Sequence, residues 1–172
     1  VDSASASGVG VLCWSVDPEF FVSNMNVVVG AMMSSVCTER PGWTMYGKSY
    51  SNGQEKALEE YMIKTPIRSR TKPDAEWAIW YPLRRVGSFY VQPPSDQCQM
   101  LLTHAAIGKS FSDLQAAHDV RLKCFGMDGS DNEYVVGIIG KDLHPLSRVV
   151  EEMRKTRHTA EFIQKLGPFF VG

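Results

Sequence analysis

The feature that most constrains the fold is a pair of strand-like segments joined by a glycine- and aspartate-rich turn. Residues 120–124 alternate apolar and basic side chains, which predicts a half-buried strand with Arg121 and Lys123 on its wet face. The turn, residues 126–132, leads into the apolar segment 133–140 (EYVVGIIG). Two strands joined by a short turn pair antiparallel, so this segment predicts an antiparallel sheet.

Further strand patterns extend this sheet. Residues 77–83 and 88–91 favour a second hairpin around residues 84–87, which ends at Pro93-Pro94. Residues 9–15 form a short apolar run typical of a buried strand. Residues 43–46 are a further short candidate, and residues 100–107 fit a strand or a helix equally well.

Helical patterns lie between these strands. Asp17-Pro18 predicts the start of a helix of about five turns ending near Val36. This helix is apolar over most of its circumference, which favours a place inside a core or beneath a partner. Other helices are expected over residues 54–64, 112–118 and 147–157, with a final turn over 159–166 that stops at Gly167-Pro168, and residues 65–75 are expected to be a polar loop.

Together these patterns predict an α+β fold. We expect residues 1–8 to be a flexible N-terminal segment and residues 9–172 to form a single α+β domain. Its antiparallel sheet should have about five strands, with helices packed mainly on one face, because the helices are mixed with sequential hairpins.

Composition bears on two classes of protein. No stretch approaches the roughly 18 apolar residues of a membrane span, which excludes that class. The balance of 18 basic and 19 acidic residues argues against a dedicated nucleic-acid domain without excluding a local phosphate site. The four cysteines form no CxxC motif, so we expect buried free thiols. Free thiols favour an intracellular location, or an organelle that the chain reaches after removal of an N-terminal targeting segment.

Three motifs suggest a bound group, and each has a simpler explanation. Gly108-Lys109-Ser110 resembles the end of a phosphate-binding loop, but Thr103 stands where that loop requires glycine. The glycines of residues 137–141 lack the spacing of a dinucleotide fingerprint, so we expect them to serve a turn or close packing. Asp128 and its acidic neighbours lack the order of a calcium loop. The sequence therefore predicts neither a cofactor nor a metal.

The histidines and cysteines show no catalytic spacing. His104 lies in an apolar run and is expected to be a satisfied core residue, and His144 precedes a proline. His158 lies in a basic run, where solvation at a helix end would explain it. Neither Cys98 nor Cys124 is linked by spacing to a histidine, so the catalytic residues of any enzymatic activity are left unassigned.

A basic segment is the clearest candidate for electrostatic function. Residues 64–85 carry six basic and two acidic groups, and they are interleaved with Trp77, Trp80 and Tyr81. Arginines beside exposed aromatic rings suit single-stranded RNA or an acidic surface, whereas rings that alternate along a strand suit a sheet core. Folding of the hairpin could gather these cations on one surface.

The preferred interpretation is a non-catalytic binding or accessory subunit that docks into a larger protein assembly. Docking would use the apolar helix and the basic loop, through Phe21, Met32, Met33, Arg68, Arg70, Lys72, Arg84 and Arg85. A protein partner is expected, and RNA or an acidic surface could bind through residues 64–85. The alternatives are a small enzyme whose pocket is assembled from sequence-distant residues and a single-stranded RNA-binding module.

Overall fold

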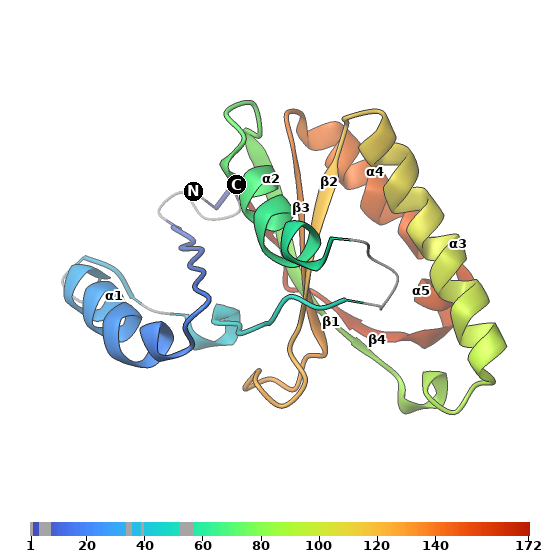
Figure 1. The fold of residues 1–172 in the computed structure, drawn as a ribbon, viewed down its shortest axis with the longest axis horizontal. Coiled ribbons are helices and arrows are strands. Elements are labelled where there is room, and N and C mark those ends of the chain that lie inside the picture. The colour runs from blue at the N-terminus through green and yellow to red at the C-terminus, as the bar shows by residue number, and fades with distance from the viewer. Residues whose placement is uncertain (1, 4–7, 34–35, 39, 52–56) are drawn as a thin grey trace.

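The predicted turn between residues 124 and 133 does join two antiparallel strands. β2 (His118–Lys123) pairs with β3 (Tyr134–Gly140) from His118 opposite Ile139 to Lys123 opposite Tyr134. The computed structural model describes residues 2–3, 8–33, 36–38, 40–51 and 57–172. Within these residues, the strand order is β2-β3-β1-β4, and β5 also pairs with β1 (Figure 1).

β1 (Trp77–Arg85) is the central strand of the sheet. It pairs with β3 along one edge, and with β4 (Ile163–Leu166) and β5 (Phe170–Val171) along the other. Every pairing is antiparallel. The predicted α+β class, with about five antiparallel strands, is therefore confirmed.

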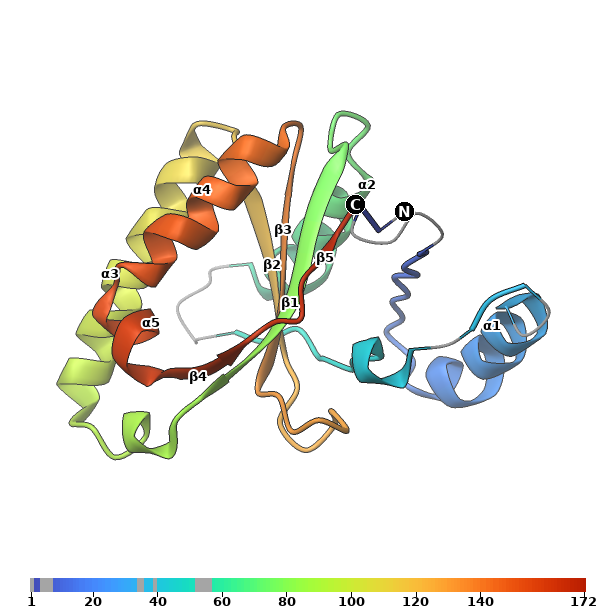
Figure 2. The same cartoon turned by 180° about the vertical axis from the view of Figure 1, so that it is seen from behind.

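Helices pack on both faces of the sheet, and mainly on one. α3 (Pro94–Asp113), α4 (Leu143–Arg154) and α5 (Arg157–Phe162) lie together on one side, and the shorter α2 (Thr65–Thr71) lies on the other (Figures 1 and 2). The main core lies under the larger layer and consists of Ile79, Tyr81, Ala117, Val136, Ile138, Leu146 and Val149.

Several predicted elements are wrong. Residues 88–91 do not form a strand, because both edges of β1 are taken by strands from far along the chain; a 3-10 turn at Gly87–Phe89 leads instead to α3. Residues 65–71 are helical, with a proline in the first turn, and not a loop. Residues 9–15 and 43–46 form no strand, residues 163–166 are a strand and not a helix, and residues 100–107 are the middle of α3.

The first predicted helix exists, but it does not lie in the core; its expected alternative place, beneath a partner, remains a prediction. A π-helical turn at Phe21–Met25 continues into α1 (Asn26–Met33). Val22, Val27 and Val28 are 74%, 67% and 53% exposed, and both views place α1 away from the sheet (Figures 1 and 2). Periodicity shows that a helix is apolar but not which neighbour covers it.

The predicted flexible segment is only partly described. Residues 1 and 4–7 lie outside the described residues, whereas the backbone nitrogen of Ser3 donates to the Val171 carbonyl at 2.6 Å. Residues 52–56, which hold the expected cap of the helix at 54–64, also lie outside them; a π-helical turn at Glu60–Lys64 leads directly into α2. Among the described residues, none of the helices is both long and apolar enough to cross a membrane.

Candidate functional site

α3 brings His104 against the other helices of its layer. The helix begins at the Pro93-Pro94 pair, where a proline in the first turn loses no helical hydrogen bond. Met100 is buried one turn before His104, and Gly108 one turn after it lies close to Met153 of α4. This spacing of four residues places His104 on the packed side of the helix, where it is half-buried.

α5 places His158 beside His104. The Thr156 side chain accepts a hydrogen bond from the Thr159 backbone nitrogen and so caps the start of α5. His158, in the first turn, is only 3% exposed. Its ring centroid lies 5.0 Å from that of His104 and 5.3 Å from that of Phe89, both in edge-to-face geometry. The expectation that His158 is a solvated helix end is therefore wrong.

Arg85 connects this histidine pair to the end of β1. Its Nε donates to Nε2 of His158 at 2.9 Å, and its Nη1 donates to the hydroxyl of Tyr134 at 3.2 Å. The guanidinium also lies over the rings of Phe89 and Tyr134, at 4.6 and 4.8 Å from their centroids. A partly buried hydrogen bond to His158 and two cation–π contacts hold Arg85 in one position.

Both histidines of the pair are neutral. Burial lowers the pKa of His104 to about 4, helped by the positive charges of Arg121 and Arg85. Burial also lowers the pKa of His158 to about 3, with further contributions from Arg85 and His104. A charged imidazole loses hydration in such a place, so the neutral ring with a free lone pair is favoured.

One polar atom on each ring lacks a partner. Nδ1 of His104 and Nδ1 of His158 are both buried and have no hydrogen-bond partner in the described part of the chain. Such groups are rare in native proteins, because an unpaired buried polar atom costs about 1–3 kcal/mol. His104 was expected to be a satisfied core residue, and this expectation is wrong.

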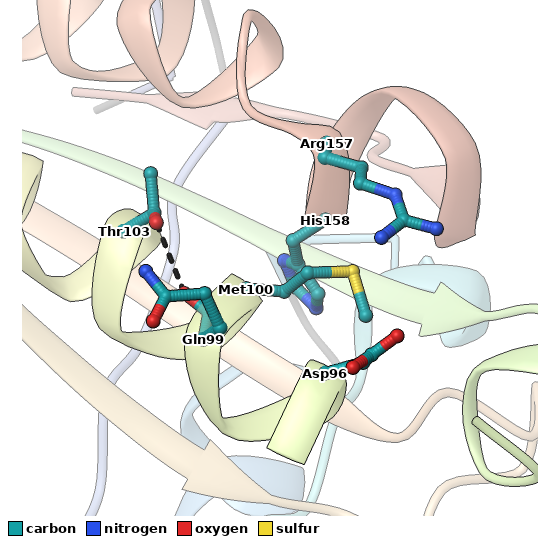
Figure 3. Close-up of a pocket in the computed structure, with 6 residues that line it drawn as sticks. All are labelled: Asp96, Gln99, Met100, Thr103, Arg157 and His158. Atoms are coloured by element: carbon teal, nitrogen blue, oxygen red, sulfur yellow. Dashed lines mark hydrogen bonds between the residues drawn. The ribbon is translucent and has the colours of Figure 1, made fainter. Parts of the chain in front are cut away.

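A shallow pocket lies between α3 and α5 (Figure 3). Its volume is about 250 Å³, and its lining consists of Asp96, Gln99, Met100, Thr103, Arg157 and His158. This volume is below the range of about 300–1,000 Å³ that is usual for small-molecule sites. The pocket reaches His158 but is not lined by His104, so we take the histidine pair with Arg85, and not the pocket, as the candidate site.

The predicted basic residues belong to two separate elements, and three of them are paired with carboxylates. Arg68, Arg70 and Lys72 lie on or directly after α2, whereas Arg84 and Arg85 lie at the end of β1. Arg68 is paired with Glu60, Lys72 with Asp74 and Arg84 with Asp131, at 2.6, 3.6 and 3.0 Å. The interleaved aromatic residues belong to the sheet, where Tyr81 is buried and Trp80 packs over Gly137.

The predicted apolar residues lie around α1. Phe21 is half-buried and stacks edge-to-face on Phe20 and Tyr46. Met32 and Met33 end α1, but their side chains lie outside the described part of the chain. The role of the eight named residues in binding a partner remains a prediction.

The simpler explanations of the three motifs agree with the structure. Gly108-Lys109-Ser110 lies inside α3 and not in a loop. A Cβ at Gly137 would lie 2.5 Å from the Trp80 ring, and one at Gly140 would lie 2.7 Å from the Ala116 carbonyl oxygen, so close packing requires both glycines. Asp128 accepts hydrogen bonds from the backbone of Ser130 and Asn132, as a turn residue does.

The expectation of buried free thiols is correct for one of the four cysteines. All four cysteines are free, but only Cys124 is buried, where burial raises the pKa of its thiol to about 11. Within the described ranges, no group of three or more His, Cys, Asp or Glu side chains could hold a metal ion.

Solved structures share this fold. A heme-binding protein from Thermus thermophilus is 25% identical, with a TM-score of 0.52 over 58% of this chain and 40% of its own. A putative chlorite dismutase is 21% identical, with a TM-score of 0.55 over 67% of this chain and 49% of its own. A mutant chlorite dismutase from Candidatus Nitrospira defluvii is 13% identical, with a TM-score of 0.51 over 57% and 40%. The chain thus spans less than half the length of each.

The family comparison decides the affiliation of the chain. No curated protein matches it. Residues 29–172, however, match the chlorite dismutase family, and this covers most of the sequence. The family is named after an enzyme, so the prediction of a non-catalytic accessory subunit for complex assembly is wrong. The chain belongs to the chlorite dismutase family.

Proposed function

We propose that this chain binds heme and that His104 is the ligand of the heme iron. The observation that carries the proposal is a half-buried imidazole on the packed side of α3 that burial keeps neutral. Neutral imidazole is the commonest metal ligand among side chains and the proximal ligand of many heme proteins. The donor at this site therefore fits the prosthetic group.

His104 is a better ligand than its neighbour. Nε2 of His158 already accepts a hydrogen bond from Arg85, whereas Nδ1 of His104 has no partner among the described residues. A nitrogen that accepts a hydrogen bond has no lone pair left for iron. We therefore assign the ligand role to His104 and a supporting role to His158.

Membership of the family and one relative support this proposal. The relative from Thermus thermophilus is described as a heme-binding protein. Bound heme would supply an iron that exchanges electrons with a small substrate, and the family name makes chlorite the first substrate to assay. Arg121, held by Asp119 at 2.7 Å, contributes positive charge toward His104, which favours an anion.

The test is titration of the chain with hemin, followed by its Soret absorption. His104→Ala should lose the spectrum of histidine-ligated heme, while His144→Ala, which removes an exposed histidine on α4, should keep it. Loss of chlorite in the presence of the loaded wild-type chain is the assay for activity. Identical spectra for wild type and His104→Ala would refute the ligand assignment.

A further inference from the structure

The surroundings of His104 differ from the usual support of an iron-binding histidine. Such a histidine almost always donates its second ring N–H to a carboxylate, a backbone carbonyl or water, which makes the imidazole a stronger donor to the metal. Here Nδ1 of His104 is buried without a partner, and the neighbouring polar group is another imidazole, that of His158.

Arg85 determines which nitrogen of His158 carries the proton. A guanidinium has only donors, so Nε2 of His158, which receives the bond at 2.9 Å, must carry the lone pair. The single proton of the neutral ring then lies on Nδ1 of His158. That atom has become a donor and cannot accept a hydrogen bond from His104.

The position of Arg85 is itself fixed by a network on the sheet. Glu133 accepts from the backbone nitrogen of Arg85 at 3.2 Å and from the hydroxyl of Tyr90 at 2.7 Å. Tyr134 accepts from the guanidinium at 3.2 Å, and the rings of Tyr134 and Phe89 flank the same group. These contacts hold the Arg85 guanidinium in place, so its hydrogen bond to His158 is maintained.

We propose that Arg85, acting through His158, is a positioning residue that withholds a hydrogen-bond acceptor from His104 and so makes it a weak donor to heme iron. The proposal rests on the proposed heme binding. When Nε2 of His104 serves as the ligand, its proton stays on the buried Nδ1, and the Nδ1 of the neighbouring His158 ring, being protonated, offers it no lone pair. Weak donation destabilises the ferric state relative to the ferrous state.

The first test needs no heme. Side-chain ¹⁵N NMR of the wild-type chain should show His158 as the Nδ1–H tautomer. Arg85→Met keeps an unbranched apolar stem but removes the guanidinium donors, so His158 should change to the Nε2–H tautomer. Arg84→Met is the matched control, because the Arg84 guanidinium is paired with the carboxylate of Asp131 at 3.0 Å. An unchanged tautomer in Arg85→Met would overturn the proposal.

The second test uses the hemin-loaded chain. In Arg85→Met, the freed Nδ1 of His158 can accept from His104, so the ferrous iron–histidine stretching frequency should rise. The equilibrium between ferric and ferrous heme should shift about tenfold toward the ferric state, which lowers the reduction potential by about 59 mV for one electron. Arg84→Met should show neither change.

The same Arg85→Met change in a chain that also carries His158→Phe separates the effect of the hydrogen bond from the effect of the lost positive charge. Loss of a cation near heme also lowers the reduction potential, but in His158→Phe no acceptor can form. Arg85→Met should therefore leave the stretching frequency unchanged in that background. His158→Phe alone should keep the wild-type frequency, because His158 accepts nothing from His104 in the wild type.

The outcomes distinguish the two proposals. A lower frequency in His158→Phe alone would show that His158 is already an acceptor and would overturn this inference. An equal rise in both backgrounds would do the same. A wild-type chain that binds no hemin would overturn heme binding, and the role of Arg85 with it, while the NMR measurement would still decide the tautomer of His158.

Discussion

At the scale of single residues, close packing explains features that resemble binding motifs. Gly137 lies under the ring of Trp80, where a Cβ would approach ring carbons to 2.5 Å. The backbone of β3 and the indole of β1 thus meet without any side chain between them. This approach accounts for glycine within an otherwise apolar strand.

Gly137→Val should therefore destabilise the chain. The new side chain would force Trp80 out of its place, at a cost of about 1–3 kcal/mol. Gly129→Val is the control, since a Cβ there meets nothing within 4 Å. Urea unfolding measures both variants, and equal free energies of unfolding would contradict the packing described for Trp80.

At the scale of elements, burial separates the helix layer from α1. Leu146 of α4 is completely buried against the sheet, whereas Val28 of α1 is 53% exposed. Both helices have apolar residues at helical spacing, so the spacing alone does not show which one supports the fold. The contacts of α4 with the sheet decide it.

Leu146→Ala should cost about 2–5 kcal/mol of unfolding free energy, because it leaves a cavity in the core. Val28→Ala should change stability by less than about 0.5 kcal/mol, because its side chain already meets solvent. Thermal unfolding followed by circular dichroism compares them. A large loss in Val28→Ala would mean that α1 is buried in solution.

At the scale of the whole molecule, the histidine pair links three distant parts of the chain. His104 comes from α3, His158 from α5 and Arg85 from β1, so the site exists only when the helix layer is packed on the sheet. A ligand that binds only the folded site stabilises the entire fold.

Hemin should therefore raise the melting temperature of the chain. At a free concentration about one hundred times the dissociation constant, the gain should be about 2.7 kcal/mol, and removal of hemin should reverse it. His104→Ala should lose most of this gain, while His144→Ala should keep it. Differential scanning calorimetry at several hemin concentrations makes the comparison, and a melting temperature that is independent of hemin would contradict binding at a folded site.

Local patterns in the sequence determined the fold class and its best-defined hairpin. The alternation of residues 120–124 and the turn after it predicted β2 and β3, because both depend on residues close together in the chain. The strand predicted at residues 88–91 does not form, because β1 pairs with β3 along one edge and with β4 along the other. Such pairing between distant segments is not visible in a local sequence pattern. Helix periodicity likewise located α1 but not its exposure.

Only the tertiary structure decided the candidate site. His104 in an apolar run, His158 in a basic run and Arg85 in a turn pattern each had an ordinary local explanation in the sequence. Their meaning comes from burial, which makes both imidazoles neutral, and from the 2.9 Å contact with Arg85. Burial and contact between distant residues arise when helices pack on the sheet, so a sequence read locally contains the residues of the site but not the site itself.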